Sequence, residues 1–274
     1  MELVPSVYSA RGQLVESSGK PLRRSKDDGA KNVSVKDIMG LCKRHGLRCI
    51  LTLTSPGCKE QALKTLESYR EHIYLGGKID MSDAKSYIDA GASRVIVGWQ
   101  LFKDGEILLE RLIGMEKLIG KDKMIVDLSC VRQFRDGRSR FYSWPDRKSD
   151  VSDFEINESG LKLIAHYCHS ILVRHYNPDG KPPSKLDTEL VVLLGCCSPV
   201  PILFGGGIHS SADIELLADL GMGNVSFTVC EELDIFGGMI PFDTYAGEAN
   251  KEAPTLGVIS SCRTSTCSLQ CTTM

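Results

Sequence analysis

Two apolar segments, about half the chain apart, end in glycines and are followed by signals that start a helix. The first runs through residues 72–77 (HIYLGG) and the second through 201–207 (PILFGGG). Asp80 follows the first run and Ser210 follows the second, and both are residue types that begin helices. A strand that ends in bare backbone beside a helix N-terminus offers unblocked N–H groups to an anion. The pattern predicts two anion sites in a duplicated half-barrel that holds a ligand with two phosphates.

Short apolar segments alternate with amphipathic ones along most of the chain. Buried strands are predicted at 3–7, 49–53, 73–75, 94–97, 124–128, 170–173, 201–204 and 225–229. Helical spacing of apolar residues is found over 35–44, 60–69, 84–89, 105–118, 159–166, 187–194 and 214–220. This alternation predicts an α/β fold, a (βα)8 TIM barrel over residues 1–250. A doubly wound sheet would need a Gly-rich fingerprint after its first strand, and residues 9–12 (SARG) are not one.

The composition fits one large α/β domain and excludes several classes of protein. Of the 274 residues, 42% are hydrophobic and 25% are charged, which is enough apolar material for a well-filled core. The net charge of −2 and the lack of a long basic run argue against a nucleic-acid partner. No apolar stretch approaches the roughly 18–20 residues that span a bilayer. No signal or transit segment is visible, so we expect a cytoplasmic protein.

Cysteine usage distinguishes the barrel from its tail. The eleven cysteines are odd in number, and Cys42, Cys49 and Cys130 lie within apolar periodic segments. A reduced thiol behaves there as a small hydrophobe, so we expect free thiols rather than disulfides. Residues 251–274 are rich in Ser, Thr and Cys without periodicity, which predicts a flexible tail. They end in the C-a-a-X form CTTM, so lipidation at Cys271 is an alternative to an unmodified tail.

Several short segments resemble those of one family. They are VIV at 95–97, LF at 101–102, LERL at 109–112, VDLSC at 126–130 and LDIFGG at 233–238. In these segments the chain resembles the eukaryotic branch of the phosphoribosylformimino-AICAR-phosphate isomerases of histidine biosynthesis, the HisA type. The resemblance covers roughly residues 3–245 without large gaps. It implies a TIM barrel that acts on a phosphorylated sugar derivative.

The resemblance also implies an Amadori rearrangement, in which one group protonates the ring oxygen or imine and another removes the C2 proton. Two carboxyl groups that face each other across the barrel mouth commonly perform such transfers. The family's general base is an Asp on the first strand, and Tyr8 stands at that position. Its acid is an Asp after the sixth strand, matched here by Asn177. Because a phenol with an ordinary pKa of about 10 is a poor base at pH 7 and an amide exchanges no proton usefully, Asp127 is the family carboxylate that remains.

The ligand-binding residues of the family map onto this chain with several changes. The positions that the resemblance places at the ligand are Gly76, Gly77, Lys78, Gly98, Trp144, Gly205, Gly206, Gly207, Cys230 and Glu231. Lys78 replaces a third glycine, adding a positive charge but also bulk, and Gly98-Trp99 replaces a Thr-Ser pair. Residues 230–232 are Cys-Glu-Glu where relatives have Gly-Ser-Ala. Two carboxylates near a phosphate dianion are unfavourable, since like charges about 4 Å apart repel by roughly 4 kcal/mol at intermediate dielectric.

Histidines are the remaining candidates for proton transfer or metal binding. His175, beside Arg174, is the histidine expected at the barrel mouth and is the candidate for replacement acid–base chemistry. His209 follows the second glycine turn, where it could contact an anion or lie in solvent. Residues 166–169 (HYCH) lack a carboxylate at metal-ligand spacing, so we predict surface and core residues there and no metal site. We expect no cofactor.

Three functional hypotheses follow. The preferred one is a pseudoenzyme of this family, with lost or greatly reduced isomerase activity, that binds a ligand or partner or performs altered chemistry around Asp127, Arg174 and His175. The alternative is a working isomerase of L-histidine biosynthesis in which Tyr8 and Asn177 are compensated. A tail-anchored scaffold would require lipid on Cys271. A phosphorylated sugar or related small molecule is the expected ligand, and the sequence leaves the oligomeric state open.

Overall fold

The strands close on themselves around a central axis. The computed structural model describes residues 1–16, 20, 34–55, 58–146 and 150–248. Within these residues eight parallel strands form a ring: β1 (Ser6–Ala10), β3 (Cys49–Leu53), β4 (Ile73–Gly77), β5 (Arg94–Val97), β8 (Met124–Asp127), β11 (Ser170–Tyr176), β12 (Ile202–Gly205) and β13 (Val225–Phe227). The N-terminus closes it, because the Val4 N–H donates to the Phe227 carbonyl at 2.9 Å and the Phe227 N–H donates to the Glu2 carbonyl at 3.1 Å. The predicted TIM barrel is confirmed.

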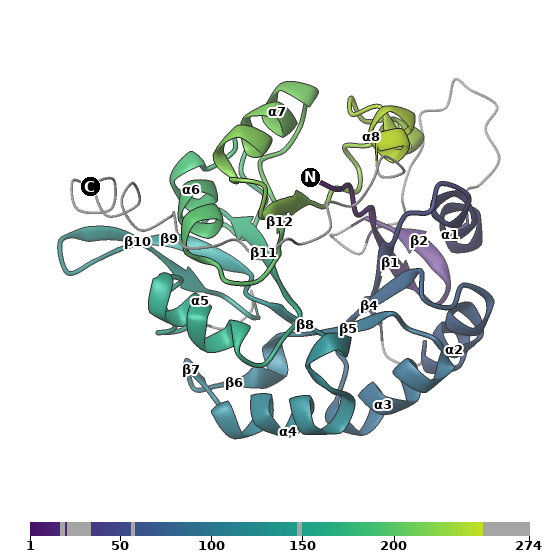
Figure 1. The fold of residues 1–274 in the computed structure, drawn as a ribbon, viewed down its shortest axis with the longest axis horizontal. Coiled ribbons are helices and arrows are strands. Elements are labelled where there is room, and N and C mark those ends of the chain that lie inside the picture. The colour runs from purple at the N-terminus through teal and green to yellow at the C-terminus, as the bar shows by residue number, and fades with distance from the viewer. Residues whose placement is uncertain (17–19, 21–33, 56–57, 147–149, 249–274) are drawn as a thin grey trace.

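Helices surround the strands (Figure 1). They are α1 (Val35–Arg44), α2 (Lys59–Ser68), α3 (Met81–Ala90), α4 (Leu109–Ile119), α5 (Glu158–Ala165), α6 (Thr188–Cys197), α7 (Ser211–Leu220) and α8 (Phe242–Glu248). Two of them begin with a capping box: the Ser34 hydroxyl accepts from the Asp37 N–H in α1, and the Ser210 hydroxyl accepts from the Asp213 N–H in α7. The polar residues that follow apolar strands therefore set where these helices start.

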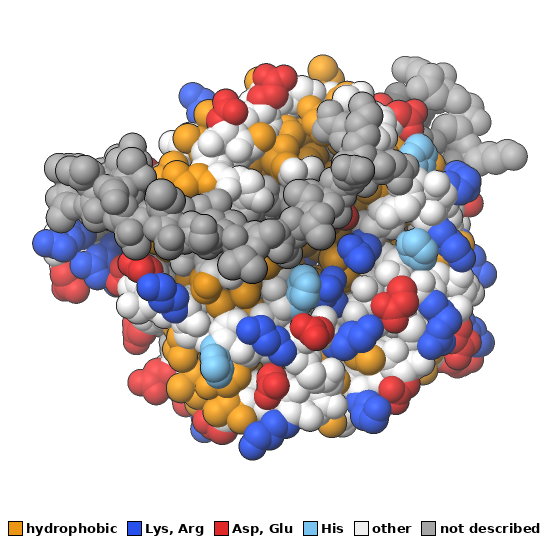
Figure 2. Space-filling model, in the orientation of Figure 1, with side chains coloured by type: hydrophobic (Ala, Val, Ile, Leu, Met, Phe, Trp, Pro, Cys, Tyr) orange, Lys and Arg blue, Asp and Glu red, His pale blue; other side chains and the backbone are white. Residues whose placement is uncertain are grey.

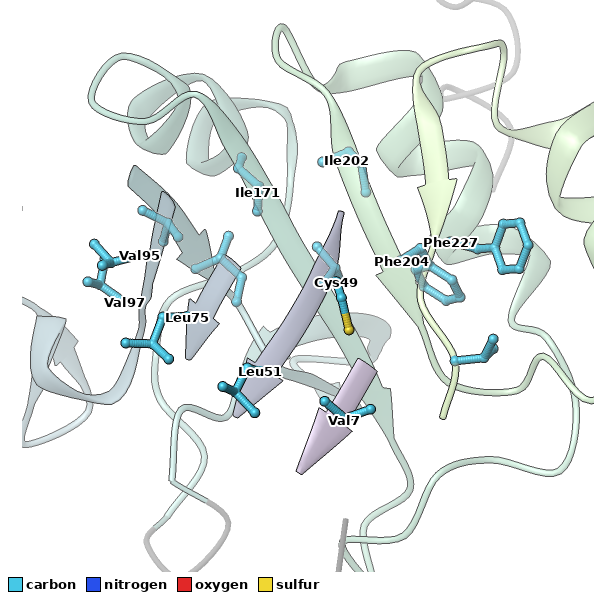
Figure 3. Close-up of a cluster of buried hydrophobic side chains, with 14 of the residues drawn as sticks. Val7, Cys49, Leu51, Leu75, Val95, Val97, Ile171, Ile202, Phe204 and Phe227 are labelled. Carbon is cyan, nitrogen blue, oxygen red and sulfur yellow. The ribbon is translucent and has the colours of Figure 1, made fainter. Parts of the chain in front are cut away.

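Alternation along each strand divides the apolar residues into two layers. One set points into the barrel and forms an interior cluster of Val4, Ile50, Tyr74, Ile96, Ile125, Leu172 and Leu203. Their neighbours point outward against the helices, and Figure 3 shows this second layer, which includes Val7, Leu51, Leu75, Val95, Ile171 and Phe204. Strands buried on both faces are expected for a parallel sheet covered by helices. The centre of the barrel is therefore filled with side chains.

Several elements differ from the sequence prediction. The first strand, predicted over 3–7, spans Ser6–Ala10, the helix predicted over 84–89 begins at Met81, and α8 and three hairpins were not predicted. The hairpins pair β1 with β2 (Gln13–Val15), β6 (Phe102–Lys103) with β7 (Glu106–Ile107), and β9 (Cys130–Arg135) with β10 (Arg138–Ser143). The helix predicted over 105–118 begins only at Leu109, because Asp104 and Gly105 adopt positive φ angles of 51° and 83° and turn the chain into the second hairpin.

The thiols predicted to be free are found in the barrel. Cys42, Cys49, Cys130, Cys168 and Cys230 are buried free thiols, as predicted.

No helix in the described residues has both the length and the apolar character for a membrane crossing. The tail at 251–274, with Cys271, lies outside the described residues, and the division at residue 250 remains a prediction. On the face shown in Figure 2, the side chains of Lys and Arg lie interspersed with those of Asp and Glu.

Truncating the barrel interior should cost far more stability than truncating the surface. We expect Leu172→Ala, at a fully buried position, to lower the free energy of unfolding by about 2–5 kcal/mol because the cavity cannot collapse among the other strand residues. The matched control is Leu163→Ala on α5, where the side chain is 36% exposed and the loss should stay below about 1 kcal/mol. Urea unfolding followed by circular dichroism measures both, and equal losses would contradict the two-layer core.

Candidate functional site

A cavity of about 420 Å³ opens at the carboxyl ends of the strands. Tyr8 from β1, Asp127 from β8 and Arg174 from β11 lie in its wall, together with Trp99 and Trp144. In TIM barrels this end carries the binding and catalytic residues, and the volume lies within the range of small-molecule sites. The Trp99 side chain, whose bulk could have filled the mouth, is 38% exposed and leaves this cavity open. We take it as the candidate ligand site.

Asp127 is held on both carboxylate oxygens. Its Oδ2 accepts a hydrogen bond from Arg174 Nη1 at 2.6 Å, and its Oδ1 accepts from the N–H and the hydroxyl of Ser129 at 2.8 and 2.7 Å. Both side chains of the ion pair are about five-sixths buried, with exposed fractions of 15% for Arg174 and 16% for Asp127. Burial acts most strongly and lowers the pKa of Arg174, but Asp127, Tyr8 and Tyr176 together outweigh it and hold this pKa above its usual range. The pair is thus a fixed, charge-neutral unit at the centre of the mouth.

Tyr8 reaches the same cavity but is a weak base. Burial raises the pKa of its phenol far above the ordinary value, and the positive charge of Arg174 offsets only part of this. Tyr176, Cys230 and Glu231 add to the upward shift in this pKa. At neutral pH the Tyr8 hydroxyl is therefore protonated, and it can donate a hydrogen bond to a ligand but cannot remove a proton from carbon.

The backbone of the first glycine turn lines the cavity. Gly77 has a φ of +118°, and a β-carbon there would come within 2.4 Å of the Leu53 carbonyl oxygen, so glycine is required. Gly76, Gly77 and Lys78 all line the cavity. The Lys78 ammonium lies 5.6 Å from the centre of the Trp99 ring. The Gly98 N–H donates to the side-chain oxygen of Gln100 at 3.1 Å. This end of the site therefore presents a cation beside a neutral amide.

The second glycine turn lies beside a separate, smaller cavity of about 60 Å³. Gly205 and Gly206 line it together with residues 228–232, and Gly206 and Gly207 adopt φ angles of +108° and +78°. The Glu232 carboxylate folds back onto the strand end, where its Oε2 accepts from the Cys230 N–H at 3.0 Å. Burial and the charges of Glu231 and Glu232 raise the pKa of the Cys230 thiol. This end of the site therefore presents acidic side chains.

The other predicted site residues lie apart from Asp127. His175 points out of the barrel, where its Nε2 is 3.9 Å from Asp187 and its ring meets Phe141 edge-on. The reason is parity: Arg174 and Tyr176 share the inward face of β11, and His175 takes the outward one. Asn177 follows the strand end as an exposed residue. His209 Nε2 lies 2.9 Å from the Pro183 carbonyl. None of these side chains is brought to the Asp127–Arg174 pair.

No group of three His, Cys, Asp or Glu side chains able to hold a metal ion occurs among the described residues. His166 is exposed and stacks edge-on against Tyr167, and Cys168 is buried with its thiol donating to the Ile164 carbonyl.

Comparison with known proteins shows the family of this barrel. A family model described as "Histidine biosynthesis protein" matches residues 16–228. This chain belongs to that family. A chloroplastic phosphoribosyl imidazole-4-carboxamide isomerase of Medicago truncatula is 30% identical over 259 residues, which cover 90% of this chain and 81% of that protein. The isomerase of the same name from Yarrowia lipolytica is 33% identical, and the aligned residues cover 67% of this chain and 70% of that protein. The isomerase from Neurospora crassa is 30% identical, and the aligned residues cover 68% of this chain and 72% of that protein.

Some residues of the site were not found from the sequence. Ser129, Tyr176 and the Thr52 side chain all line the cavity, and among the described residues the Thr52 hydroxyl has no hydrogen-bond partner. Strand alternation puts Arg174 and Tyr176 on the face of Leu172 and His175 on the other, but only the structure shows that the Leu172 face is the inward one. Ser129 gave no such signal, since it lies past the strand end.

Tyr8 should remain a protonated phenol well above neutral pH. Because burial raises the pKa of this hydroxyl, the phenolate absorbance of the folded wild-type protein minus that of Tyr8→Phe should be close to zero at about pH 10, where an ordinary tyrosine is half ionised. The same subtraction on urea-unfolded chains is the control and should show about half a phenolate. A folded-state difference as large as the unfolded one would contradict the assignment.

Proposed function

We propose that this protein is a phosphosugar-binding barrel of the histidine biosynthesis family in which isomerase activity is lost or greatly reduced. The observation that carries the proposal is the bonding of Asp127. Of the family's carboxylates it is the one present at the mouth, and both of its oxygens are held, by Arg174 and by Ser129. By the family resemblance, Tyr8 stands at the position of the base and Asn177 at that of the acid, and neither offers a carboxylate.

Ligand binding is supported by the parts of the site that remain. The cavity of about 420 Å³ combines glycine backbone at Gly76 and Gly77 with the Lys78 ammonium and two indole rings. A phosphate suits the first part, because a lysine ammonium and glycine N–H groups favour an anion. A sugar or heterocycle suits the second, because Trp144 and Trp99 offer flat apolar faces. The buried free thiols fit a reducing compartment such as the cytoplasm.

A second candidate function is the isomerase reaction itself. The relatives named above favour it, since they carry the isomerase name and match this chain along most of its length. Nothing in those comparisons indicates a loss of activity. For this candidate, the Tyr8 hydroxyl or the Asp127–Arg174 pair would have to replace the two family carboxylates in proton transfer.

Phosphate binding at the first glycine turn is testable with the intrinsic fluorescence of the protein. The chain has two tryptophans, and both line the cavity. We expect D-ribose 5-phosphate to change this fluorescence, and Lys78→Ala to weaken binding by about tenfold or more, since the loss of a charged hydrogen bond exceeds about 1.4 kcal/mol. Lys85→Ala, an exposed position on α3 paired with Asp89, is the control and should bind as wild type does. Equal affinity in all three proteins would contradict a phosphate site at this turn.

Restoring a carboxylate at the cavity wall should restore proton transfer. We expect wild-type protein to give no measurable turnover of the family's aminoaldose substrate, and Tyr8→Asp to reach a kcat/KM at least about 100-fold above the detection limit, the usual contribution of a general base. Tyr8→Asn is the matched control, because it opens the same space without the base. Wild-type turnover comparable with that of the Yarrowia lipolytica relative would overturn the pseudoenzyme proposal in favour of the isomerase.

A further inference from the structure

The two glycine turns face each other across the barrel. Strand order runs β1-β3-β4-β5-β8-β11-β12-β13 and closes through the N-terminal segment. Four steps round this ring of eight separate β4 from β12, whichever direction is taken. The turns that end in Gly77 and Gly206 therefore lie on opposite sides of the mouth. A ligand with an anionic group at each end would have to reach both.

The two ends differ in charge. At the β4 end the side chain added to the glycine turn is Lys78, and the nearby Gly98 N–H is bonded to a neutral amide oxygen. At the β12 end the side chains added are Glu231 and Glu232, and the Cys230 N–H is bonded to the Glu232 carboxylate at 3.0 Å. Arg174 contributes no net charge to either end, because Asp127 neutralises it at 2.6 Å. The side chains at the two turns therefore favour an anion at the Lys78 end over the Glu232 end.

The two ends also differ in space. The cavity that extends from Lys78 to the Asp127–Arg174 pair has a volume of about 420 Å³, and the one beside Gly205 and Gly206 has about 60 Å³. The helix that follows the second turn is also satisfied internally, since the N–H groups of His209 and Ser210 both donate to the Asp213 carboxylate at 2.9 Å. A carboxylate on a strand-end N–H takes the place that an anion from solution would otherwise take.

We infer that Glu232 is a built-in occupant of the second anion position, so that the ligand carries a single phosphate, bound at the Lys78 end. The inference rests on the proposed phosphosugar binding and specifies its ligand class. Glu232 is thereby a specificity-determining residue: it excludes a second phosphate by charge and by occupying the Cys230 N–H. The uncharged end of the ligand then lies toward the Asp127–Arg174 pair and the Tyr8 hydroxyl.

The inference is tested by comparing a monophosphate with a bisphosphate on full-length protein. The probes are D-ribose 5-phosphate and D-ribulose 1,5-bisphosphate, with affinities from tryptophan fluorescence and calorimetry. We expect wild type to bind the bisphosphate no more tightly than the monophosphate. Glu232→Ala removes the charge and leaves the Cys230 N–H without its acceptor, so it should tighten bisphosphate binding by about tenfold or more, with monophosphate binding unchanged.

Two further variants make the result specific. Glu232→Gln keeps an acceptor for the Cys230 N–H but removes the charge, so an intermediate gain is expected. Glu215→Gln, an exposed carboxylate on α7, makes the same change in net charge away from the mouth and should change neither affinity. Circular dichroism checks that each variant folds.

The outcomes separate the inference from the function on which it rests. Wild-type protein that binds the bisphosphate at least tenfold more tightly than the monophosphate would overturn the inference and leave phosphosugar binding intact. An unchanged bisphosphate affinity in Glu232→Ala, with monophosphate binding present, would overturn it as well. Failure of both probes to bind both wild type and Glu232→Ala would instead overturn the proposed function, and the inference with it.

Discussion

The ion pair between Arg174 and Asp127 determines what chemistry the barrel mouth can perform. It joins two neighbouring strands, β11 and β8, close to the point where their pairing ends, and it is largely buried. Removing either partner would leave a charge without compensation in a poorly solvated place, which is strongly unfavourable. The carboxylate is therefore needed by the guanidinium, and its second oxygen is held by Ser129. An Asp127 carboxylate with both oxygens hydrogen-bonded can position its neighbours well but is poorly suited to exchange protons.

Much of the fold could be predicted from the sequence because its signals are local. Helix α1 was predicted at its observed bounds, since apolar spacing and the Ser34 capping box agree. The three hairpins were missed although each contains a readable signal. Their turns are Arg11-Gly12, Asp104-Gly105 and Asp136-Gly137, all with positive φ at both residues. Amphipathic spacing hid the second turn, because Ile107 and Leu108 continue the apolar pattern of α4 on its N-terminal side.

The candidate site was predictable by position but not by side-chain direction. The family resemblance placed Tyr8, Asp127 and Lys78 in the mouth, and all three line one cavity. Direction depends on the register of each strand, which a segment of uniformly apolar residues such as 171–173 does not reveal. Arg174 and His175 therefore looked equivalent from the sequence, whereas one lies inside the barrel and the other faces Asp187 on the outside. The Glu232 contact depends on a side-chain conformation that no sequence pattern encodes.

Glycine turns alone are weak evidence for phosphate binding in this barrel. A β-carbon at Gly206 would lie 2.5 Å from the His175 carbonyl oxygen, and one at Gly207 would lie 2.3 Å from the Lys185 carbonyl oxygen. Backbone packing therefore requires both glycines whether or not an anion binds beside them. The feature that first indicated two anion sites is equally a requirement of the fold. Whether an anion binds or is excluded therefore depends on the neighbouring side chains, which are a lysine at one turn and a pair of glutamates at the other.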